Sequence, residues 1–469
     1  AMTGLRSMGA VDAIWLAMDS PDNLMVIDSV MMLEGPVDWE RLASVVQRRL
    51  VDRYPVFTQR VVEASTPLGM PHWENVEDFA LAAHLHHVEL PAPADDAAVQ
   101  AFIEARMAEP LPRDRPLWDF YLVDGHEDGA VVVARFHHAL ADGIALAQVL
   151  LSLTDETETG DLEDAGQPPP VAASPPRHAG GLLDLPGRLT RDVASGVRSA
   201  LHLFGEIPAA LNPAHAIEAM TVARQTAQIA DKLLLSHEPQ SPVSGDPGIA
   251  KRAVWSRPRS LVDVKLVGRA TGATVNDILI GAVSGAIATY VDTHGGDPED
   301  LTTMVPVNLR DLREPLPREL GNKFALVMLP LPTGRLAPLQ RLAEAKSRMD
   351  TIKHSPEAVL TFGLINAIGR TNTEIAKQVI DFFAAKAIGV TTNVAGPMTG
   401  RYLAGTRITS ILGWVPGSGR HTLGVCIFSY DGVVRVGFKA DAGVVTEPSG
   451  LVDAFDEEMD TLVRLAAAV

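Results

Sequence analysis

The chain has 469 residues, of which 46% are hydrophobic and 21% charged, and its formal net charge is −18. This length exceeds what one hydrophobic core organises, so we expect at least two domains around a large buried core. The acidic balance argues against a nucleic-acid partner, because neutralising phosphates requires clustered Lys and Arg.

The single cysteine, Cys426, excludes an intrachain disulfide and a thiolate metal cluster. It stands in the apolar stretch GVCIFSY, so we expect a buried thiol. The sequence shows neither a signal region nor about 18 uninterrupted apolar residues. We therefore expect a cytoplasmic protein without a spanning helix.

The first 153 residues mix helix and strand patterns. Apolar residues recur at helical spacing between Val37 and Leu50, and Pro55 ends that helix. The stretches YLVDG and AVVVARF predict strands separated by Asp-Gly turn signals. This part is typical of an α/β sandwich.

Residues 154–181 are rich in acids and prolines, which predicts an extended linker with little apolar area to bury. We therefore place an N-terminal domain at 1–153 and a C-terminal domain at 182–469. After the linker, an apolar helical stripe runs from Leu185 to Phe204 beside several arginines. We expect it to pack on the protein, with a membrane surface as the alternative.

The C-terminal part predicts a second α/β set. Its expected strands are RAVWSR, TTMVPVNL, ALVMLPL, GVCIFSY and VVRVGFKA, and its expected helices lie near 275–291, 336–352 and 374–386. The similar make-up of the two parts points to a duplicated domain.

Two adjacent histidines end the apolar run 131–136, in the stretch RFHHALADGIA. Neighbouring strand residues point to opposite faces, so only one of His137 and His138 can serve a given site. A neutral imidazole takes a proton from an alcohol near neutral pH, which makes one of them a candidate general base. Asp142 is expected to accept an imidazole N–H or to pair with an arginine, and Gly143 permits close approach of a ligand. A pair of buried structural histidines is the alternative.

A second pair, His86-His87, lacks a following Asp-Gly and a long apolar strand, so we interpret it as structural or surface-exposed. A metal site at His137, His138 and Asp142 is disfavoured, because adjacent strand residues diverge and the sequence shows no further ligand cluster. We expect no metal.

HHALADG resembles the HHxxxDG motif of the CoA-dependent acyltransferase superfamily, which includes chloramphenicol acetyltransferase, carnitine acyltransferases and peptide-synthetase condensation domains. Further stretches resemble the bacterial wax ester synthase/diacylglycerol acyltransferase family. They are GAVDAIWLAMDSPDNLMVI near the N-terminus, Pro116-Leu117-Trp118, Asn276-Asp277 in ATVNDILIG, and TTNVAGP at 391–397. The resemblance runs from about residue 8 to the C-terminus. It implies an α/β fold of two chloramphenicol-acetyltransferase-like domains with an active-site channel between them.

The resemblance also implies roles for individual residues. His138 would be the general base and Asn276 would help to hold the oxyanion, while Asp142 would hold the active-site loop and the imidazole. His137 would be structural. The residues expected at the substrate site are Gly143, Pro116, Leu117, Trp118, Asp277 and Arg310, the last as a partner of Asp142 across the domains.

Several of these residues have a purely structural alternative. Thr274 with Asp277 predicts a capping box at the start of a helix. Trp118 would ordinarily anchor a core, and Arg310 would ordinarily end a surface helix.

The activity implied by the resemblance is O-acyl transfer of a long-chain acyl group from acyl-CoA to diacylglycerol or a long-chain alcohol, without a cofactor. Attack would be direct, because the sequence has no GxSxG elbow and Cys426 stands beside no base. Such apolar substrates imply peripheral contact with the inner membrane or lipid droplets. The candidate contact residues, besides the 185–204 stripe, are Leu360, Phe362, Leu364, Ile365, Phe382 and Phe383.

Three alternatives stay open at this point. The first is a condensation-type or polyketide-associated acyltransferase with a carrier-protein donor, which the PLW and ND stretches disfavour. The second is a non-catalytic lipid-binding protein of the same fold, and the third is a metal-dependent hydrolase.

Overall fold

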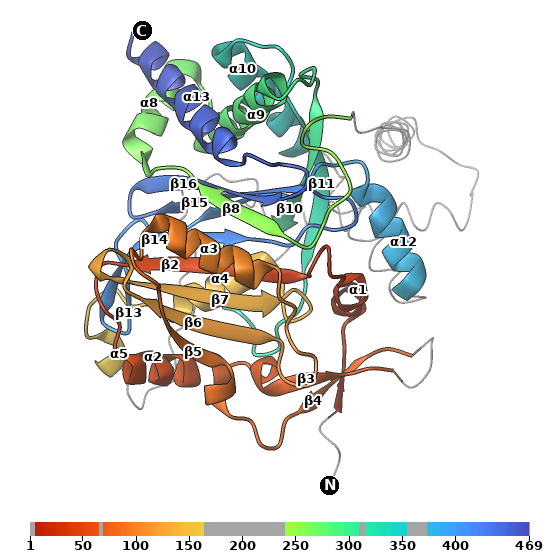
Figure 1. Cartoon of the computed structure of the whole chain (residues 1–469), viewed down its shortest axis with the longest axis vertical. Coiled ribbons are helices and arrows are strands. Elements are labelled where there is room, and N and C mark those ends of the chain that lie inside the picture. The colour runs from red at the N-terminus through yellow and green to blue at the C-terminus, as the bar shows by residue number, and fades with distance from the viewer. Residues whose placement is uncertain (1–4, 65–68, 164–239, 309–314, 354–372, 469) are drawn as a thin grey trace, which may run out of the picture.

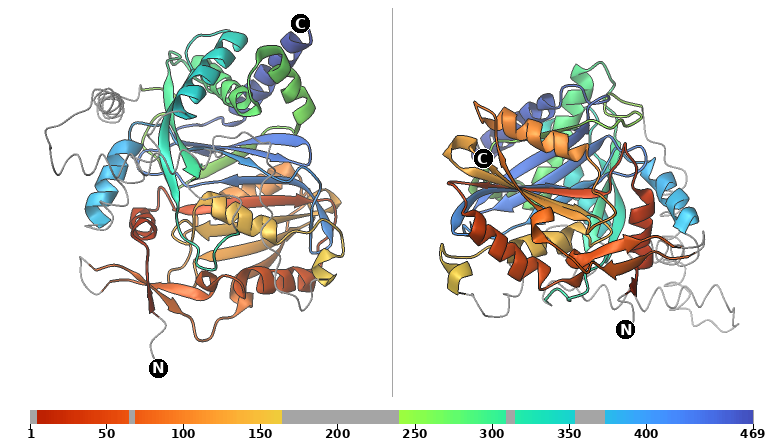
Figure 2. Two further views of the ribbon diagram at one scale, coloured as in Figure 1. Left: turned by 180° about the vertical axis from the view of Figure 1, so that it is seen from behind. Right: turned by 60° about the horizontal axis from the view of Figure 1, so that its bottom comes forward.

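The structure is a computed structural model that describes residues 5–64, 69–163, 240–308, 315–353 and 373–468 (Figure 1). Two α/β halves are stacked on each other, and helices cover the outer side of each half (Figures 1 and 2). The arrangement agrees with the α/β sandwich expected from the sequence.

A six-stranded sheet organises the N-terminal half, in the order β13-β14-β2-β7-β6-β5. Its central strands β2 (Val26–Leu33) and β7 (Ala130–His137) are buried at every position, as a continuous apolar run predicts. β6 (Trp118–Asp124) pairs antiparallel with β7, and β5 (Leu85–Glu89) pairs parallel with β6. The two strands expected in this region are confirmed.

The same sheet is completed by chain from the C-terminal half. β14 (Thr406–Trp414) pairs antiparallel with β2, and the short β13 (Tyr402–Leu403) pairs with β14. β14 brings Ile408 and Leu412 into the N-terminal core. The N-terminal sheet therefore depends on residues far beyond the expected boundary at 153–182.

The first residues of the expected linker are folded, which differs from the prediction. Asp155 exchanges backbone hydrogen bonds with Tyr402, and its buried carboxylate lies 2.8 Å from Arg49 Nη2. The short helix α5 (Gly160–Glu163) follows. A stretch rich in acidic residues predicts solvent-exposed chain. Here Arg49 and Arg41 instead pair with the buried carboxylates of Asp155 and Asp161. The remaining linker and the 185–204 stripe lie outside the described residues.

Other elements of the N-terminal half surround its sheet. They are β1 (Leu5–Ser7), α1 (Ala10–Met18), α2 (Trp39–Val46), the π-helical turn Gln47–Val51, the 3₁₀ turn Pro55–Thr58, β3 (Gln59–Val62), β4 (His72–Asn75), α3 (Asp96–Met107) and α4 (Gly143–Ser152). The helix expected from Val37 is confirmed, and it ends before Pro55.

A five-stranded sheet organises the C-terminal half, in the order β12-β15-β16-β8 with β9 beside β16. Its strands are β8 (Lys251–Trp255), β9 (Arg259–Ser260), β12 (Thr391–Ala395), β15 (Leu423–Tyr430) and β16 (Val433–Asp441). The helices on its outer face, seen at the top of Figure 1, are α8 (Leu261–Thr271), α9 (Val275–Thr293), α10 (Pro338–Lys353) and α13 (Ser449–Ala467).

β10 (Leu301–Asn308) and β11 (Phe324–Leu331) form a separate antiparallel ribbon that extends alongside both halves (Figures 1 and 2). α12 (Thr373–Ala384) packs beside α1 on the same side of the molecule. Trp15 of α1 and Ile380 of α12 share a small core with Met304 of the ribbon. The strands and helices expected after residue 251 are thus confirmed.

Within the described residues, none of the helices is by itself long and apolar enough to cross a membrane. α8 and α9 reach such a length and composition only as a pair, and they bend by 97° where they meet.

Candidate active site

A cavity that opens to solvent lies between the two halves, and the space within it and at its opening is about 1090 Å³. The N-terminal half contributes β2 and α4 to its wall, and the other half contributes β10, β11, β12, β14 and β15. Its lining is mostly apolar, and includes Ile27, Met31, Leu146, Leu150, Ile411 and Phe428. His138, Asp142 and Asn393 are among the few polar residues on the wall. An apolar cavity with a few polar groups suits a long acyl chain with one reacting end.

His138 follows the last residue of β7 and lines this cavity. Its backbone N–H donates to the Met25 carbonyl at 2.7 Å, and its ring lies 4.7 Å from the Trp15 ring, centroid to centroid. Burial lowers the pKa of His138 to about 4, although the nearby negative charge of Asp142 acts in the opposite direction. The imidazole is therefore neutral at physiological pH and able to accept a proton.

His137 is held inside its own half. Its backbone N–H donates to the Leu117 carbonyl, and its Nδ1 accepts from the Ala139 N–H at 3.1 Å. Its Nε2 lies 3.6 Å from Asp19 Oδ2. These contacts show that the two histidines of the motif have different environments, and they are those expected of a structural His137.

Asp142 joins the two halves and begins a helix. Its Oδ1 accepts from the Ala145 N–H at 2.9 Å, which makes it the N-cap of α4. Its Oδ2 accepts from the Lys323 N–H at 2.9 Å, across the interface between the halves. Arg310, the partner expected from the sequence, lies outside the described residues. Gly143 lines the cavity, where an added Cβ would come within 3.0 Å of Val415.

The Asn276-Asp277 pair divides into two environments. Asp277 and Thr274 form a reciprocal capping box at the start of α9, which confirms the structural alternative for Asp277. Asn276 Oδ1 accepts from Asn393 Nδ2, and the Nδ2 of Asn276 is buried without a hydrogen-bond partner among the described residues. Asn393 lines the cavity wall and Asn276 lies behind it.

Pro116-Leu117-Trp118 supports the histidine strand and does not line the cavity. Trp118 is fully buried, its Nε1 donates to the Phe57 carbonyl at 2.9 Å, and its ring stacks on His84. The triplet was expected to bind substrate, but none of its three residues reaches the cavity wall. Trp118 instead packs in the core, where burial of a large indole is most favourable.

The remaining candidates behave as expected. His86 bonds to Asp119, and the exposed His87 bonds to Asp124. Cys426 is buried, and burial raises the pKa of its thiol to about 12. A thiol with so high a pKa is a poor nucleophile.

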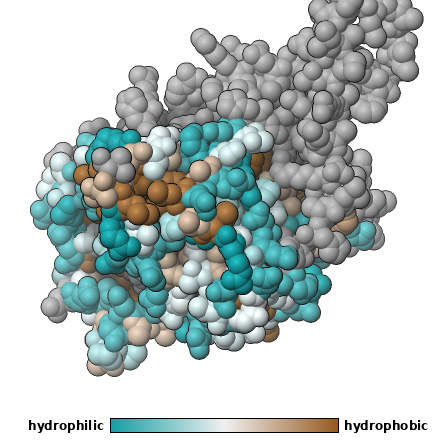
Figure 3. Space-filling model, turned by 90° about the horizontal axis from the view of Figure 1, so that it is seen from above, coloured by the Kyte–Doolittle hydropathy of each residue, from teal (hydrophilic) through white to brown (hydrophobic). Residues whose placement is uncertain are grey.

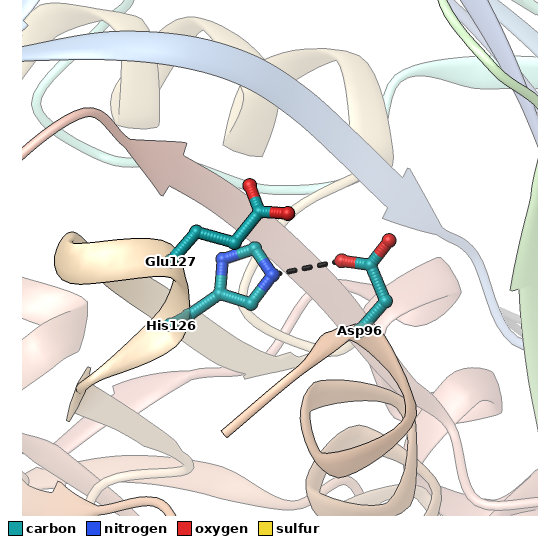
Figure 4. A group of neighbouring side chains, drawn as sticks. All are labelled: Asp96, His126 and Glu127. Atoms are coloured by element: carbon teal, nitrogen blue, oxygen red, sulfur yellow. Dashed lines mark hydrogen bonds and ion pairs between the residues drawn. The ribbon is translucent and has the colours of Figure 1, made fainter. Parts of the chain in front are cut away.

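Among the described residues, one group of three side chains could together ligate a metal ion: Asp96, His126 and Glu127 (Figure 4). They come from the start of α3 and the turn between β6 and β7, away from the cavity lining. His126 Nε2 already bonds to Asp96 Oδ1 at 2.7 Å. This cluster is separate from the site that contains His138.

Comparison with known protein families decides the relationship. The model of the wax ester synthase/diacylglycerol acyltransferase catalytic domain matches residues 8–279, and the model of the family's C-terminal domain matches residues 320–463. The chain belongs to the wax ester synthase/diacylglycerol acyltransferase family. The resemblance stated from the motifs is thereby confirmed, and the protein is an acyltransferase.

Relatives of this acyltransferase cover it almost completely. A putative diacylglycerol O-acyltransferase of Mycobacterium tuberculosis (strain ATCC 25618 / H37Rv) is 28% identical over 493 aligned residues, which span 99% of this chain and 98% of the relative. A probable diacylglycerol O-acyltransferase of the same strain is 25% identical over 488 residues, with 98% and 96% covered.

Solved structures of similar fold support the architecture. The wax ester synthase/diacylglycerol acyltransferase from Marinobacter aquaeolei VT8 superposes with a TM-score of 0.68 at 19% identity, covering 98% of this chain and 100% of that one. The first condensation domain of the calcium-dependent antibiotic synthetase gives 0.61 at 17% identity, covering 99% and 96%. The two-domain fold expected from the motifs is confirmed.

Sequence reasoning missed several residues of this acyltransferase site. Trp15 stands in an almost wholly apolar helix, where nothing in the spacing distinguishes it from core residues. Asn322 and Lys323 follow a glycine just before an apolar strand. The sequence therefore indicated only that a strand begins there. The tertiary fold is what brings Asn322 to His138 and Lys323 to Asp142.

Proposed function

We propose that this acyltransferase moves a long-chain acyl group from acyl-CoA to the hydroxyl of diacylglycerol or of a long-chain alcohol, with His138 as the general base. The observation that carries the proposal is a neutral, buried imidazole on the wall of a largely apolar cavity between the halves. The family membership supplies the reaction class, and the named relatives make diacylglycerol the first acceptor to test.

The reaction needs one proton-transfer group. His138 takes the hydroxyl proton of the acceptor while the acceptor oxygen bonds to the thioester carbonyl carbon. The carbon–sulfur bond then breaks, and the imidazolium returns the proton to the departing CoA sulfur. No acyl-enzyme intermediate is required, and the buried Cys426 thiol offers no competing nucleophile.

The paired amides of Asn276 and Asn393 are our candidates for holding the oxyanion. Asn393 lies on the cavity wall, and Asn276 sits behind it in the first turn of α9, where free backbone N–H groups and the helix dipole favour negative charge. We therefore propose that Asn276 acts together with Asn393. Asp142 would hold the loop and support the imidazole electrostatically.

The test is acyl-CoA turnover by a folded His138→Ala variant. Removal of a general base typically costs about 10²- to 10⁴-fold in rate. His87→Ala is the matched control, because it removes the exposed histidine of the other His-His pair. Activity retained in His138→Ala would refute the proposed base.

Thin-layer analysis of products from one acyl-CoA offered both acceptors would identify the acceptor, and an acyl-carrier donor in the same assay would test the condensation-type alternative.

We also propose that the enzyme binds peripherally to the inner membrane or to lipid droplets through α12. Phe382 of α12 is 48% exposed, with the Lys386 ammonium 4.9 Å from its ring centroid. The Lys386 side chain is itself buried, so it is the exposed aromatic ring that suits a lipid boundary. α12 packs beside α1, which brings Trp15 to the cavity wall. The other apolar segments expected to contact lipid, and the side chain of Phe383, lie outside the described residues.

Vesicle flotation tests this contact. Phe382→Asp should reduce the membrane-bound fraction of the intact protein, because it places a charge where an aromatic ring would enter the boundary. Val262→Asp is the control, since Val262 is 68% exposed on α8, away from α12 (Figure 1). The end of the molecule that carries α8 is largely hydrophilic and carries a hydrophobic area among smaller apolar patches (Figure 3). If only Val262→Asp releases the protein from vesicles, the membrane contact lies at the α8 end and not at α12. If the wild type does not float with vesicles, the proposed membrane contact is refuted.

A further inference from the structure

Asn322 lies behind His138, in the segment that leads into β11. Its Nδ2 donates to the His138 carbonyl at 2.8 Å and to Asp12 Oδ1 at 2.7 Å. Its backbone N–H donates to the same Asp12 oxygen at 3.0 Å. Asn322 is buried and is not part of the cavity lining. It therefore contacts the backbone of the proposed base from outside the cavity lining.

The orientation of the Asn322 amide follows from these partners. Its nitrogen faces two oxygen acceptors, so exchanging the amide N and O would place oxygen against oxygen at both contacts. Only a side chain that donates twice from one atom satisfies both the carbonyl and the carboxylate. Asparagine has such a group, and aspartate in its place has none.

The groups around the His138 carbonyl also act on the imidazole. The His138 backbone and the Asn322 side chain both raise the pKa of His138, against the larger lowering by burial. The other groups that act on this ring are the carboxylate of Asp142, which raises its pKa, and His137, which lowers it. Holding the carbonyl therefore fixes the backbone from which this imidazole extends to the cavity wall.

The acid nearest to this histidine in the motif, Asp142, also joins the two halves. Its two oxygens bond to the Ala145 and Lys323 N–H groups. The neighbouring residues Asn322 and Lys323 thus bind the two ends of the active-site loop, at His138 and at Asp142. The loop of the N-terminal half is held by a segment of the C-terminal half.

We propose that Asn322 is a positioning residue, which fixes the carbonyl of His138 and through it the imidazole, and that Asp12 holds Asn322 in place. The proposal rests on the function proposed above for His138. It adds a neutral amide from the opposite half to the groups that hold this imidazole, beside Asp142.

The first experiment measures kcat and KM of Asn322→Ala with a long-chain acyl-CoA. A misplacement of about 1 Å at a reacting group can cost about 10²-fold in rate, so we expect kcat to fall about 10- to 100-fold while KM for acyl-CoA changes less than about twofold. The acid limb of kcat/KM should move to lower pH, because the amide that raises the pKa of His138 is gone. Glu104→Gln is the control, since Glu104 also bonds across the halves, to Arg252 and the Ala253 N–H, but does not line the cavity.

The second experiment exchanges the two side chains in the double variant Asp12→Asn/Asn322→Asp. The new pair can remake the bond between α1 and the segment before β11, with the amide and the carboxylate reversed. It cannot donate to the His138 carbonyl, because an ionised carboxylate only accepts. We expect the double variant to recover the thermal stability lost in Asn322→Asp, but not its kcat.

Three outcomes would overturn the proposal. They are an unchanged kcat in a folded Asn322→Ala variant, recovery of kcat together with stability in the exchanged pair, and an equal loss of kcat in Glu104→Gln. The wild type and His138→Ala are measured alongside. Full activity in His138→Ala would refute the base itself, whereas an inactive His138→Ala beside an active Asn322→Ala would refute only the role of Asn322.

Discussion

His138 combines a polar function with a nearly complete loss of solvent. The residue is 5% exposed, and desolvation of the imidazolium outweighs the attraction of Asp142. The ring is consequently a weak base in the resting enzyme but is fully in the form that accepts a proton. His421, on the segment before β15, is buried to a similar extent, and burial lowers its pKa to about 4 as well.

These two histidines predict a specific pH dependence. kcat/KM should stay level from about pH 8 to pH 5 and fall as one proton binds near pH 4, where His138 becomes charged.

The free energy of unfolding should depend on pH through the same two histidines, His138 and His421. The unfolded chain takes up protons near pH 6.5 and the folded protein only near 4, so stability falls as pH drops through this window. A pH–rate series and urea unfolding at pH 7 and 5 check both; an acid limb near 6.5 would contradict the buried, neutral base.

At the residue scale, the motif predicted chemistry better than it predicted contacts. The division of roles between His137 and His138 follows from strand alternation, which the sequence carries directly. The carboxylates were harder to assign, because Asp142 and Asp277 are helix caps as well as motif residues. A capping carboxylate and a substrate-binding one look alike in sequence.

The active-site element is a strand, a tight loop and a helix in immediate succession. β7 ends at His137, and α4 begins at Gly143 with Asp142 as its N-cap. The loop can be this short because one carboxylate satisfies donors on both sides of it, in α4 and in the opposite half. The aspartate of the motif therefore has a structural role: it begins α4 and binds the opposite half.

We predict that Asp142→Ala destabilises the protein more than an ordinary cap removal does. Loss of an N-cap costs about 1 kcal/mol, and leaving the Lys323 N–H without its acceptor adds about 1 to 3 kcal/mol. Asp38→Ala is the matched control, because Asp38 caps α2 with a single exposed bond to the Arg41 N–H. Urea unfolding at pH 7 measures both. Equal losses would mean that the bond to Lys323 contributes little.

At the scale of the whole molecule, β13 and β14, from the second half of the sequence, complete the sheet of the N-terminal half. β14 pairs with one edge of β2 and also packs against β15, so this strand of the N-terminal sheet lies at the interface with the other sheet. Because β2 is buried along its full length, it would expose an apolar, unpaired edge without β14. The halves are stacked domains, but they are not independent.

This sharing predicts that the N-terminal half does not fold alone. Residues 1–163 expressed by themselves should aggregate, as an exposed hydrophobic edge strand does, and co-expression with residues 240–469 should restore soluble protein. Size-exclusion chromatography and near-UV circular dichroism would report the result. A monomeric, cooperatively folded 1–163 fragment would contradict the importance of β14.

The sequence by itself determined the family, the reaction class, the strand that delivers the histidines and most element positions, because these depend on local motifs and on periodicity. Only the tertiary structure decided which side chains meet. Asn322 is 184 positions from His138, and β14 crosses to a sheet formed mainly by the first half of the chain. Such contacts arise from packing of the halves, for which no local pattern exists, and they give each motif residue its partner.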